Sequence, residues 1–168
     1  NHIMKHIGWC LEKIQIAFGN MPKELTSEDS KKQAKYVIDD VQKYADTLVD
    51  LVHHHKFWKI IHQLENTPIE DIKMHANHIE ELAKNLEHAL YVIDLTLKEL
   101  RELATLKSMN GNDVRKWRRS YDKLVLMIDQ KFGGDYGELR KEFQIALHTK
   151  EQLQEIVKSE EHLAEFLP

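Results

Sequence analysis

Apolar side chains recur every three or four residues along most of the chain, and the longest such pattern runs from Thr67 to Asn110. Three positions in every seven are apolar there, which is typical of an amphipathic helix inside a bundle. The three lines of core-facing positions are Ile72, Ile79, Leu86, Ile93 and Leu100; His75, Leu82, Ala89, Thr96 and Leu103; and Ala76, Ala83, Leu90, Leu97 and Ala104. A helix of this length, roughly 60 Å at 1.5 Å per residue, is stable in water only when it packs against partners. The pattern therefore predicts one long central helix with the other segments packed on it.

The residues at both ends of this pattern predict where the central helix begins and ends. Thr67 and Glu70 are spaced for a capping box, with Pro68 at the first helical position. Gly111, between two asparagines, predicts the C-terminus because glycine readily adopts the left-handed conformation that ends many helices.

A second long helix is predicted upstream, from a cap at Thr26 and Asp29 to about Glu65. The connection to the central helix is very short, so the two should form an antiparallel hairpin. Near residues 53–56 the apolar stripe changes side when it is projected at 100° per residue. Either the helix kinks there, or its tip is covered on both sides by the N-terminal helix or by another chain.

Shorter patterns predict a helix over residues 4–18 and two helices after Gly111. The first of these two should end at Gly133-Gly134, and the second should begin with a cap at Asp135 and carry apolar positions as far as Leu167. The apolar stripe of the first consists of Val114, Trp117, Tyr121, Leu124, Ile128 and Phe132. No segment shows the alternation of a strand. We therefore expect an all-α fold: an elongated antiparallel bundle of two long helices, two C-terminal helices and a short N-terminal helix.

Composition agrees with one helix-rich domain spanning residues 1–168. The chain has six glycines, three prolines and 31% charged residues. It has no uninterrupted apolar run near 18 residues, so no membrane span is expected. Asn1-His2-Ile3 looks like a remnant that precedes the protein proper, and we interpret Met4 as the native start.

Cysteine content and net charge limit the expected cellular location and the expected binding partners. Cys10 is the only cysteine, which excludes an internal disulfide and a cysteine-rich zinc site and favours a reducing, cytoplasmic location. It lies beside the stripe of the first helix, so we expect a small buried hydrophobe rather than a nucleophile. The formal net charge of −4 argues against a protein whose whole surface binds nucleic acid.

Eleven histidines are many for 168 residues, and four of them are candidate metal ligands. In the predicted hairpin His55 falls level with His78, His62 lies one heptad from His55, and His75 faces the core. Neutral imidazoles that converge from two helices can bind zinc, nickel or iron. The alternative is that these are scattered surface and boundary histidines bonded to water or to backbone carbonyls. The chain has neither the Glu-x-x-His pairs of di-iron bundles nor the H-E-x-x-H of zinc proteases.

A basic cluster surrounds two aromatic residues in the predicted helix after Gly111. Its cations are Arg115, Lys116, Arg118, Arg119 and Lys123. Cations with Trp117 and Tyr121 between them could grip a phosphate backbone and stack a base. The alternative is a solvated charged face, because both aromatic residues lie on the apolar stripe.

Two groups of apolar residues exceed what the hairpin alone should bury. They are Phe57, Ile60, Ile61 and Leu64 near the tip, and Tyr91, Val92 and Leu95 on the central helix. They indicate either cover by the chain's own terminal helices or a subunit interface. A dimer with a two-fold axis is the commonest way to cover such a surface.

These observations favour a non-enzymatic interaction or scaffold protein that self-associates, with protein as its partner. No tight glycine-rich turn presents a serine nucleophile, and the adjacent Glu80 and Glu81 lie outside the apolar stripe as surface charge. No cofactor is expected except in the alternative hypothesis, a metal-binding bundle that uses the histidines. The third hypothesis is a nucleic-acid-associated subunit that uses the basic cluster.

Overall fold

The computed structural model describes the backbone of residues 2–164 and the side chains of residues 3–149 and 151. Within that range all regular secondary structure is helical and there are no strands, which confirms the all-α prediction. The elements are α1 (His2–Phe18), α2 (Glu28–Val52), α3 (His55–Glu65), α4 (Glu70–Thr105), α5 (Gly111–Val125), the π-helix η1 (Leu126–Phe132) and α6 (Gly133–Ala164). None of the described helices is both long and apolar enough to cross a membrane. The predicted apolar positions from 153 to 167 lie outside the residues whose side chains are described.

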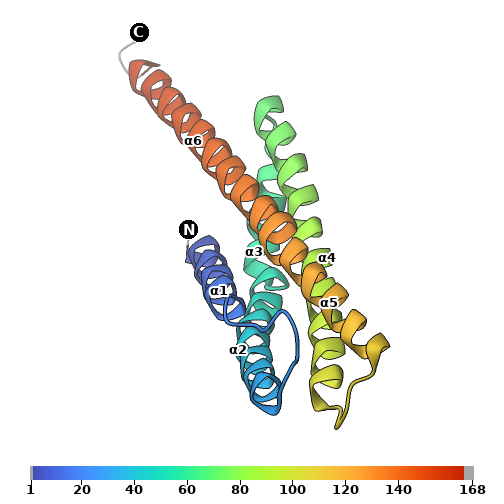
Figure 1. The fold of residues 1–168 in the computed structure, drawn as a ribbon. Helices are drawn as coiled ribbons and strands as arrows, with labels where there is room; N and C mark the ends of the chain where they lie inside the picture. The colour runs from blue at the N-terminus through green and yellow to red at the C-terminus, as the bar shows by residue number, and fades with distance from the viewer. Residues whose placement is uncertain (1, 165–168) are drawn as a thin grey trace.

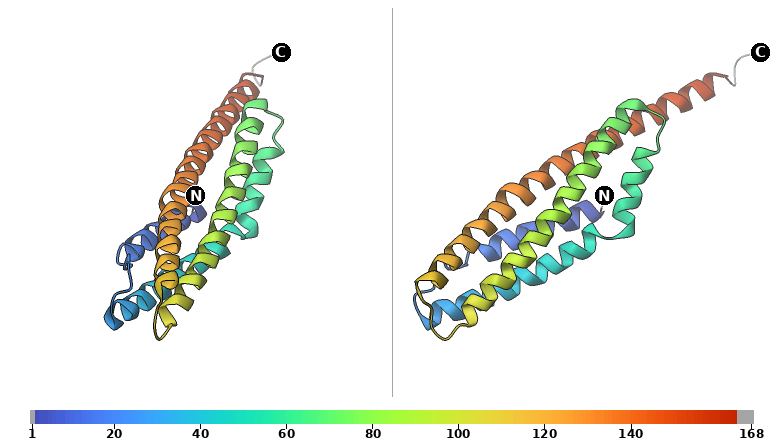
Figure 2. Two further views of the ribbon diagram at one scale, coloured as in Figure 1. Left: turned by 45° about the vertical axis from the view of Figure 1, so that its right-hand side comes forward. Right: turned by 90° about the vertical axis from the view of Figure 1, so that its right-hand side faces the viewer.

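Helix α4 is the centre of an elongated bundle (Figures 1 and 2). It packs against α2 and α3 on one side and against α5, η1 and α6 on the other. Helix α1 packs mainly on α2 and reaches η1 and α6. The α5–η1–α6 rod runs along α4 and continues past the connection between α3 and α4 (Figure 2).

The core follows the heptad pattern of α4 closely. Every residue of its three predicted lines is buried except His75, which is half-buried. The hydroxyl of Thr96, a polar member of these lines, donates to the Val92 carbonyl oxygen at 2.7 Å. Burying one Leu or Ile side chain contributes about 1.5–3 kcal/mol, so this helix supplies much of the free energy that holds the bundle together.

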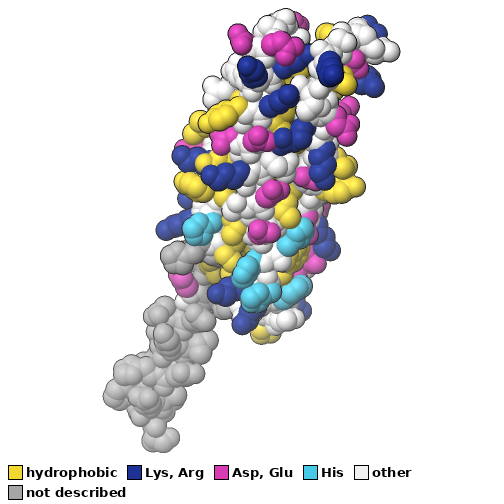
Figure 3. Space-filling model, turned by 90° about the horizontal axis from the view of Figure 1, so that it is seen from below, with side chains coloured by type: hydrophobic (Ala, Val, Ile, Leu, Met, Phe, Trp, Pro, Cys, Tyr) yellow, Lys and Arg dark blue, Asp and Glu magenta, His cyan; other side chains and the backbone are white. Residues whose placement is uncertain are grey.

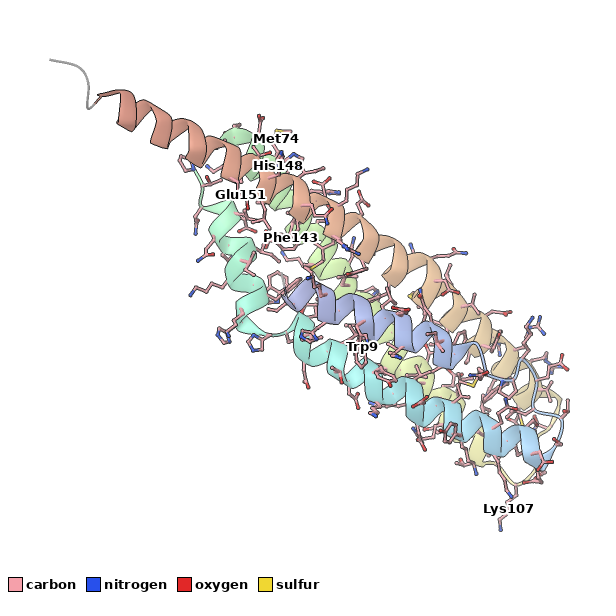
Figure 4. All side chains as sticks on the ribbon, turned by 90° about the vertical axis from the view of Figure 1, so that its left-hand side faces the viewer. Trp9, Met74, Lys107, Phe143, His148 and Glu151 are labelled. Atoms are coloured by element: carbon pink, nitrogen blue, oxygen red, sulfur yellow. The ribbon has the colours of Figure 1, made fainter. Side chains whose placement is uncertain are left out.

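The chain breaks between α2 and α3 at His53 and His54, so the structure shows the first of the two alternatives, a kink, and the predicted single helix to about Glu65 is two helices. A ring nitrogen of His54 accepts from the Lys56 N–H at 3.1 Å and caps α3. The indole N–H of Trp58 donates to the Val52 carbonyl oxygen at 2.8 Å, which satisfies an acceptor that the break frees. The break turns the apolar side of α3 toward α4 and α6. Phe143 of α6 lies 6.4 Å from Phe57 between ring centroids, so the chain itself covers this tip (Figure 4).

Two predicted N-terminal caps are wrong, by two residues for α4 and by one residue for α2. Helix α4 begins at Glu70 with Ile69 as its N-cap, and no side chain caps it. The Thr67 N–H instead bonds to the Leu64 carbonyl at 3.4 Å, so Thr67 belongs to the end of α3. Helix α2 is capped by Ser27 and Ser30, whose hydroxyl groups each accept from the other's backbone N–H, rather than by Thr26 and Asp29.

The predicted end of the central helix at Gly111 is also wrong. Helix α4 ends at Thr105, and Gly111 is the first residue of α5, with no left-handed glycine in the described chain. Asn110 and Asp113 form a capping box for α5, because each side chain accepts from the other's backbone N–H at 2.9–3.0 Å.

The predicted break at Gly133-Gly134 does not exist, and neither does a new cap at Asp135. The Gly133 N–H donates to the Ile128 carbonyl, the five-residue spacing of a π-helix, so the hydrogen-bond ladder continues. Buried Ile128, Phe132 and Tyr136 keep the apolar stripe in register across both glycines. The two predicted C-terminal helices therefore form one rod.

Candidate functional site

Two histidines of α4 have carboxylate partners on α6. His75 Nδ1 is 2.6 Å from Glu142 Oε2, and His78 Nε2 is 2.9 Å from Glu138 Oε1. The two helices run antiparallel, so residues three apart on α4 meet residues four apart on α6. The pairs therefore hold the outer edge of the α4–α6 contact.

Charge around this edge favours the protonated imidazole of His78. The hydrogen bond to Glu138 raises the pKa of His78, against the smaller opposing effect of burial. Glu142 and Glu81 add smaller contributions in the same direction. A cleft of about 290 Å³ opens beside the pairs, lined by Asp71, Met74, His75, His78, Glu142 and Thr149. This cleft can receive a small polar group, but one ring nitrogen of each of its imidazoles already contacts a carboxylate.

The four candidate metal ligands do not converge. His62 pairs with Glu65 of its own helix at 3.3 Å, and His55 stacks on His54 with ring centroids 4.6 Å apart. Among the side chains that the structure describes, no three histidine, cysteine or acidic groups are placed to hold a metal ion. Histidines gather near the end of the bundle in Figure 3, but as neighbours on the surface. The break before α3 reorients His55 and His62, and carboxylates of α6 pair with His75 and His78. The geometry therefore does not support the metal hypothesis.

Two carboxyl groups approach each other across α3 and α4. Burial, and after it the neighbouring Glu80 side chain, raise the pKa of Glu65, while the Glu65 side chain and Lys84 lower the pKa of Glu80. Lys84 Nζ lies 3.2 Å from Glu80 Oε1. The two carboxyl groups are therefore a structural contact of the hairpin tip.

The cations of the basic cluster lie at the surface, but its two aromatic rings are packed against other parts of the chain. Arg115, Lys116, Arg118, Arg119 and Lys123 are all exposed. The indole of Trp117 is buried and donates to the Pro22 carbonyl at 3.0 Å, and Tyr121 stacks on Phe18 at 5.2 Å. Neither ring is free to stack a base. Arg118 is paired with Glu24 and Asp122 at 3.7 and 3.6 Å, so the cluster resembles a solvated charged face.

The predicted interface residues divide into two groups. Phe57, Ile61 and Leu64 are buried within the chain, so they offer no surface to a partner, and Ile60 and Val92 are partly buried. Tyr91 and Leu95 remain 62% and 48% exposed, one turn apart on the outer face of α4.

An unbroken exposed stripe runs through these two residues along the middle of α4. Its members, each three or four positions from the next, are Lys84, His88, Tyr91, Leu95, Lys98 and Glu102. We call it the α4 outer stripe. It lies opposite the side that contacts the core, so no other helix of the described chain covers it.

Sequence reasoning missed the partners that come from distant helices. Glu138 and Glu142 are four apart, a spacing that places them on one helix face, but nothing in the sequence pointed that face at α4. It also missed the aromatic contact between Trp9 of α1 and Tyr44 of α2, whose rings meet edge to face at 5.7 Å. Trp9 lies off the apolar stripe of its helix, which was the available signal.

Comparison of this chain with protein-family models, with curated proteins and with solved structures finds no match.

Proposed function

We propose that this protein is a non-enzymatic helical-bundle interaction protein that acts as a scaffold by associating with itself. The observation that carries the proposal is the exposure of Tyr91 and Leu95 on the middle of the longest helix. Large apolar side chains that are paired on one helix face are typical of contacts between helices, and tyrosine is enriched at protein interfaces.

The surrounding contacts support an interaction role over a chemical one. The histidines between α4 and α6 bridge helices through carboxylates, as structural groups do. Cys10 is buried, and burial raises the pKa of its thiol, so a thiolate nucleophile is disfavoured. A buried free thiol also fits the proposed reducing, cytoplasmic location.

The proposal is tested by light scattering of the purified chain over a concentration series. We expect the average mass to rise toward twice that of the chain in the micromolar range. Leu95→Glu should weaken the association by about tenfold or more, because the charge would be buried without a partner.

Val114→Glu is the matched control, because Val114 on α5 is 45% exposed and outside the α4 outer stripe. It should leave the concentration dependence unchanged. A mass equal to that of one chain up to high micromolar concentration would refute the proposal.

A further inference from the structure

The α4 outer stripe has a spacing that reads the same in both directions. Its members are separated by four, three, four, three and four residues, and the centre of this series falls at position 93. A two-fold axis through that point would place each member of the stripe opposite another member of a second copy.

From this spacing we infer that the occupant of the α4 outer stripe is a second copy of this chain, packed antiparallel about position 93. The inference rests on the self-association proposed above and specifies its face and register. Tyr91 of one copy lies against Leu95 of the other, twice in the dimer, so the exposed apolar pair covers itself.

The charges of the stripe are complementary in this register. Lys84 is nine residues before the centre and Glu102 is nine after it, so each lies opposite the other in the second copy. Among the described residues no hydrogen bond or ion pair engages the Glu102 carboxylate. Lys84 is paired only with Glu80 of its own helix. An exposed ion pair of this kind contributes little to stability.

The third pair of the register is compatible with the other two. His88 lies opposite Lys98 of the second copy, where a neutral imidazole nitrogen can accept from an ammonium group. A parallel arrangement would instead place Lys84 against Lys84 and Glu102 against Glu102. The charge pattern therefore selects the antiparallel dimer.

Helix geometry permits these contacts at a shallow crossing angle. Residues nine positions from the axis lie about 13.5 Å away along the helix. At the crossing angle of about 20° that is typical of bundles, opposite residues at that distance are offset sideways by about 5 Å, which the long Lys and Glu side chains span. We expect the two α4 helices to cross at this angle. They would then pack against each other as neighbouring helices of a bundle do.

The test is sedimentation analysis of the full chain with charge reversals, alone and combined. Lys84→Glu and Glu102→Lys should each weaken the dimer by about tenfold, because each replaces two attractive contacts with two repulsive ones. The double variant restores opposite charges and should return to within about threefold of the wild type. Lys116→Glu on α5 and Glu12→Lys on α1 change the net charge equally at exposed positions and should have no effect.

The outcomes separate the register from the proposed function. If neither single reversal weakens the dimer, this register is wrong and self-association still stands. The same holds if the double variant is helical by circular dichroism but its dimer is no stronger than those of the single variants. A wild-type chain that stays monomeric would overturn both.

Discussion

The Nδ1 atom of His75 on α4 lies 2.6 Å from the Glu142 carboxylate on α6, and this contact joins helices whose residues are 67 positions apart. Both side chains are partly buried, so water weakens the bond less than it would at the surface. A charge-assisted hydrogen bond of this kind contributes more than an exposed ion pair.

We predict a measurable coupling between His75 and Glu142. In a double-mutant cycle with His75→Gln and Glu142→Gln at pH 6, the coupling free energy should be about 1–2 kcal/mol. Urea unfolding of the four proteins measures it. A coupling below about 0.3 kcal/mol would show that the two side chains do not stabilise each other.

The neighbouring pair predicts a pH dependence with a defined sign. The pKa of His78 in the folded chain is raised, chiefly by Glu138. The resulting stability is fully present below the unfolded value of about 6.5 and is lost as pH rises through the folded pKa. The wild type should therefore exceed Glu138→Gln in free energy of unfolding at pH 6, and the difference should shrink by pH 8.5. It should be at most about 1 kcal/mol, because both side chains are well exposed. A difference that grows with pH would contradict the assignment.

Leu82 tests the packing of α4 in the core. Leu82→Ala should lower the free energy of unfolding by about 2–5 kcal/mol, because Leu82 is buried and the substitution leaves a cavity. Met74→Ala on the same helix should change it by less than about 0.5 kcal/mol, because Met74 is exposed. Equal effects of the two substitutions would show that the heptad assignment is wrong.

Two helical glycines should respond to alanine in opposite directions. Gly137→Ala on α6 should stabilise the chain by about 0.5–1 kcal/mol, because a methyl group there meets no other atom and alanine favours the helix. Gly8→Ala on α1 would place a methyl group on the Tyr136 hydroxyl, which donates to the Met4 carbonyl at 2.9 Å. We expect a loss of about 1–3 kcal/mol there. Thermal melts of both variants measure the contrast, and a stabilised Gly8→Ala would contradict the close contact of α1 with α6.

Periodicity predicted the long elements well because burial decides them. The three lines of α4 are buried apart from His75, and residues 4–18 lie within α1. The ends were predicted less well, because a cap depends on where neighbouring helices stop. Thr67 is bound by the last turn of α3, and Gly133 is carried through by a π-helical turn whose stripe remains in register. Intrinsic preferences of glycine and threonine are small beside those contacts.

The candidate sites were harder to predict, because they require positions across helices. The histidines were expected to meet one another, but the side chains opposite His75 and His78 are carboxylates of α6. The aromatic residues of the basic cluster were placed on the apolar stripe by both the pattern and the structure. Tyr91 and Leu95 were identified from the sequence as lying away from the main stripe, and the structure describes both as exposed.

Pulsed electron spin resonance on a spin label at Asn77→Cys tests the central claim most directly. Asn77 is exposed on the outer side of α4, beyond the α4 outer stripe. The native Cys10 is buried, and the raised pKa of its thiol makes it slow to react with the label. Position 77 lies 16 residues before the proposed axis, so the two labels of a dimer should be separated by about 48 Å along the helices. A single intermolecular distance near that value would agree with antiparallel self-association through α4. A distance below about 30 Å, or no intermolecular distance at concentrations where the chain should be dimeric, would contradict it.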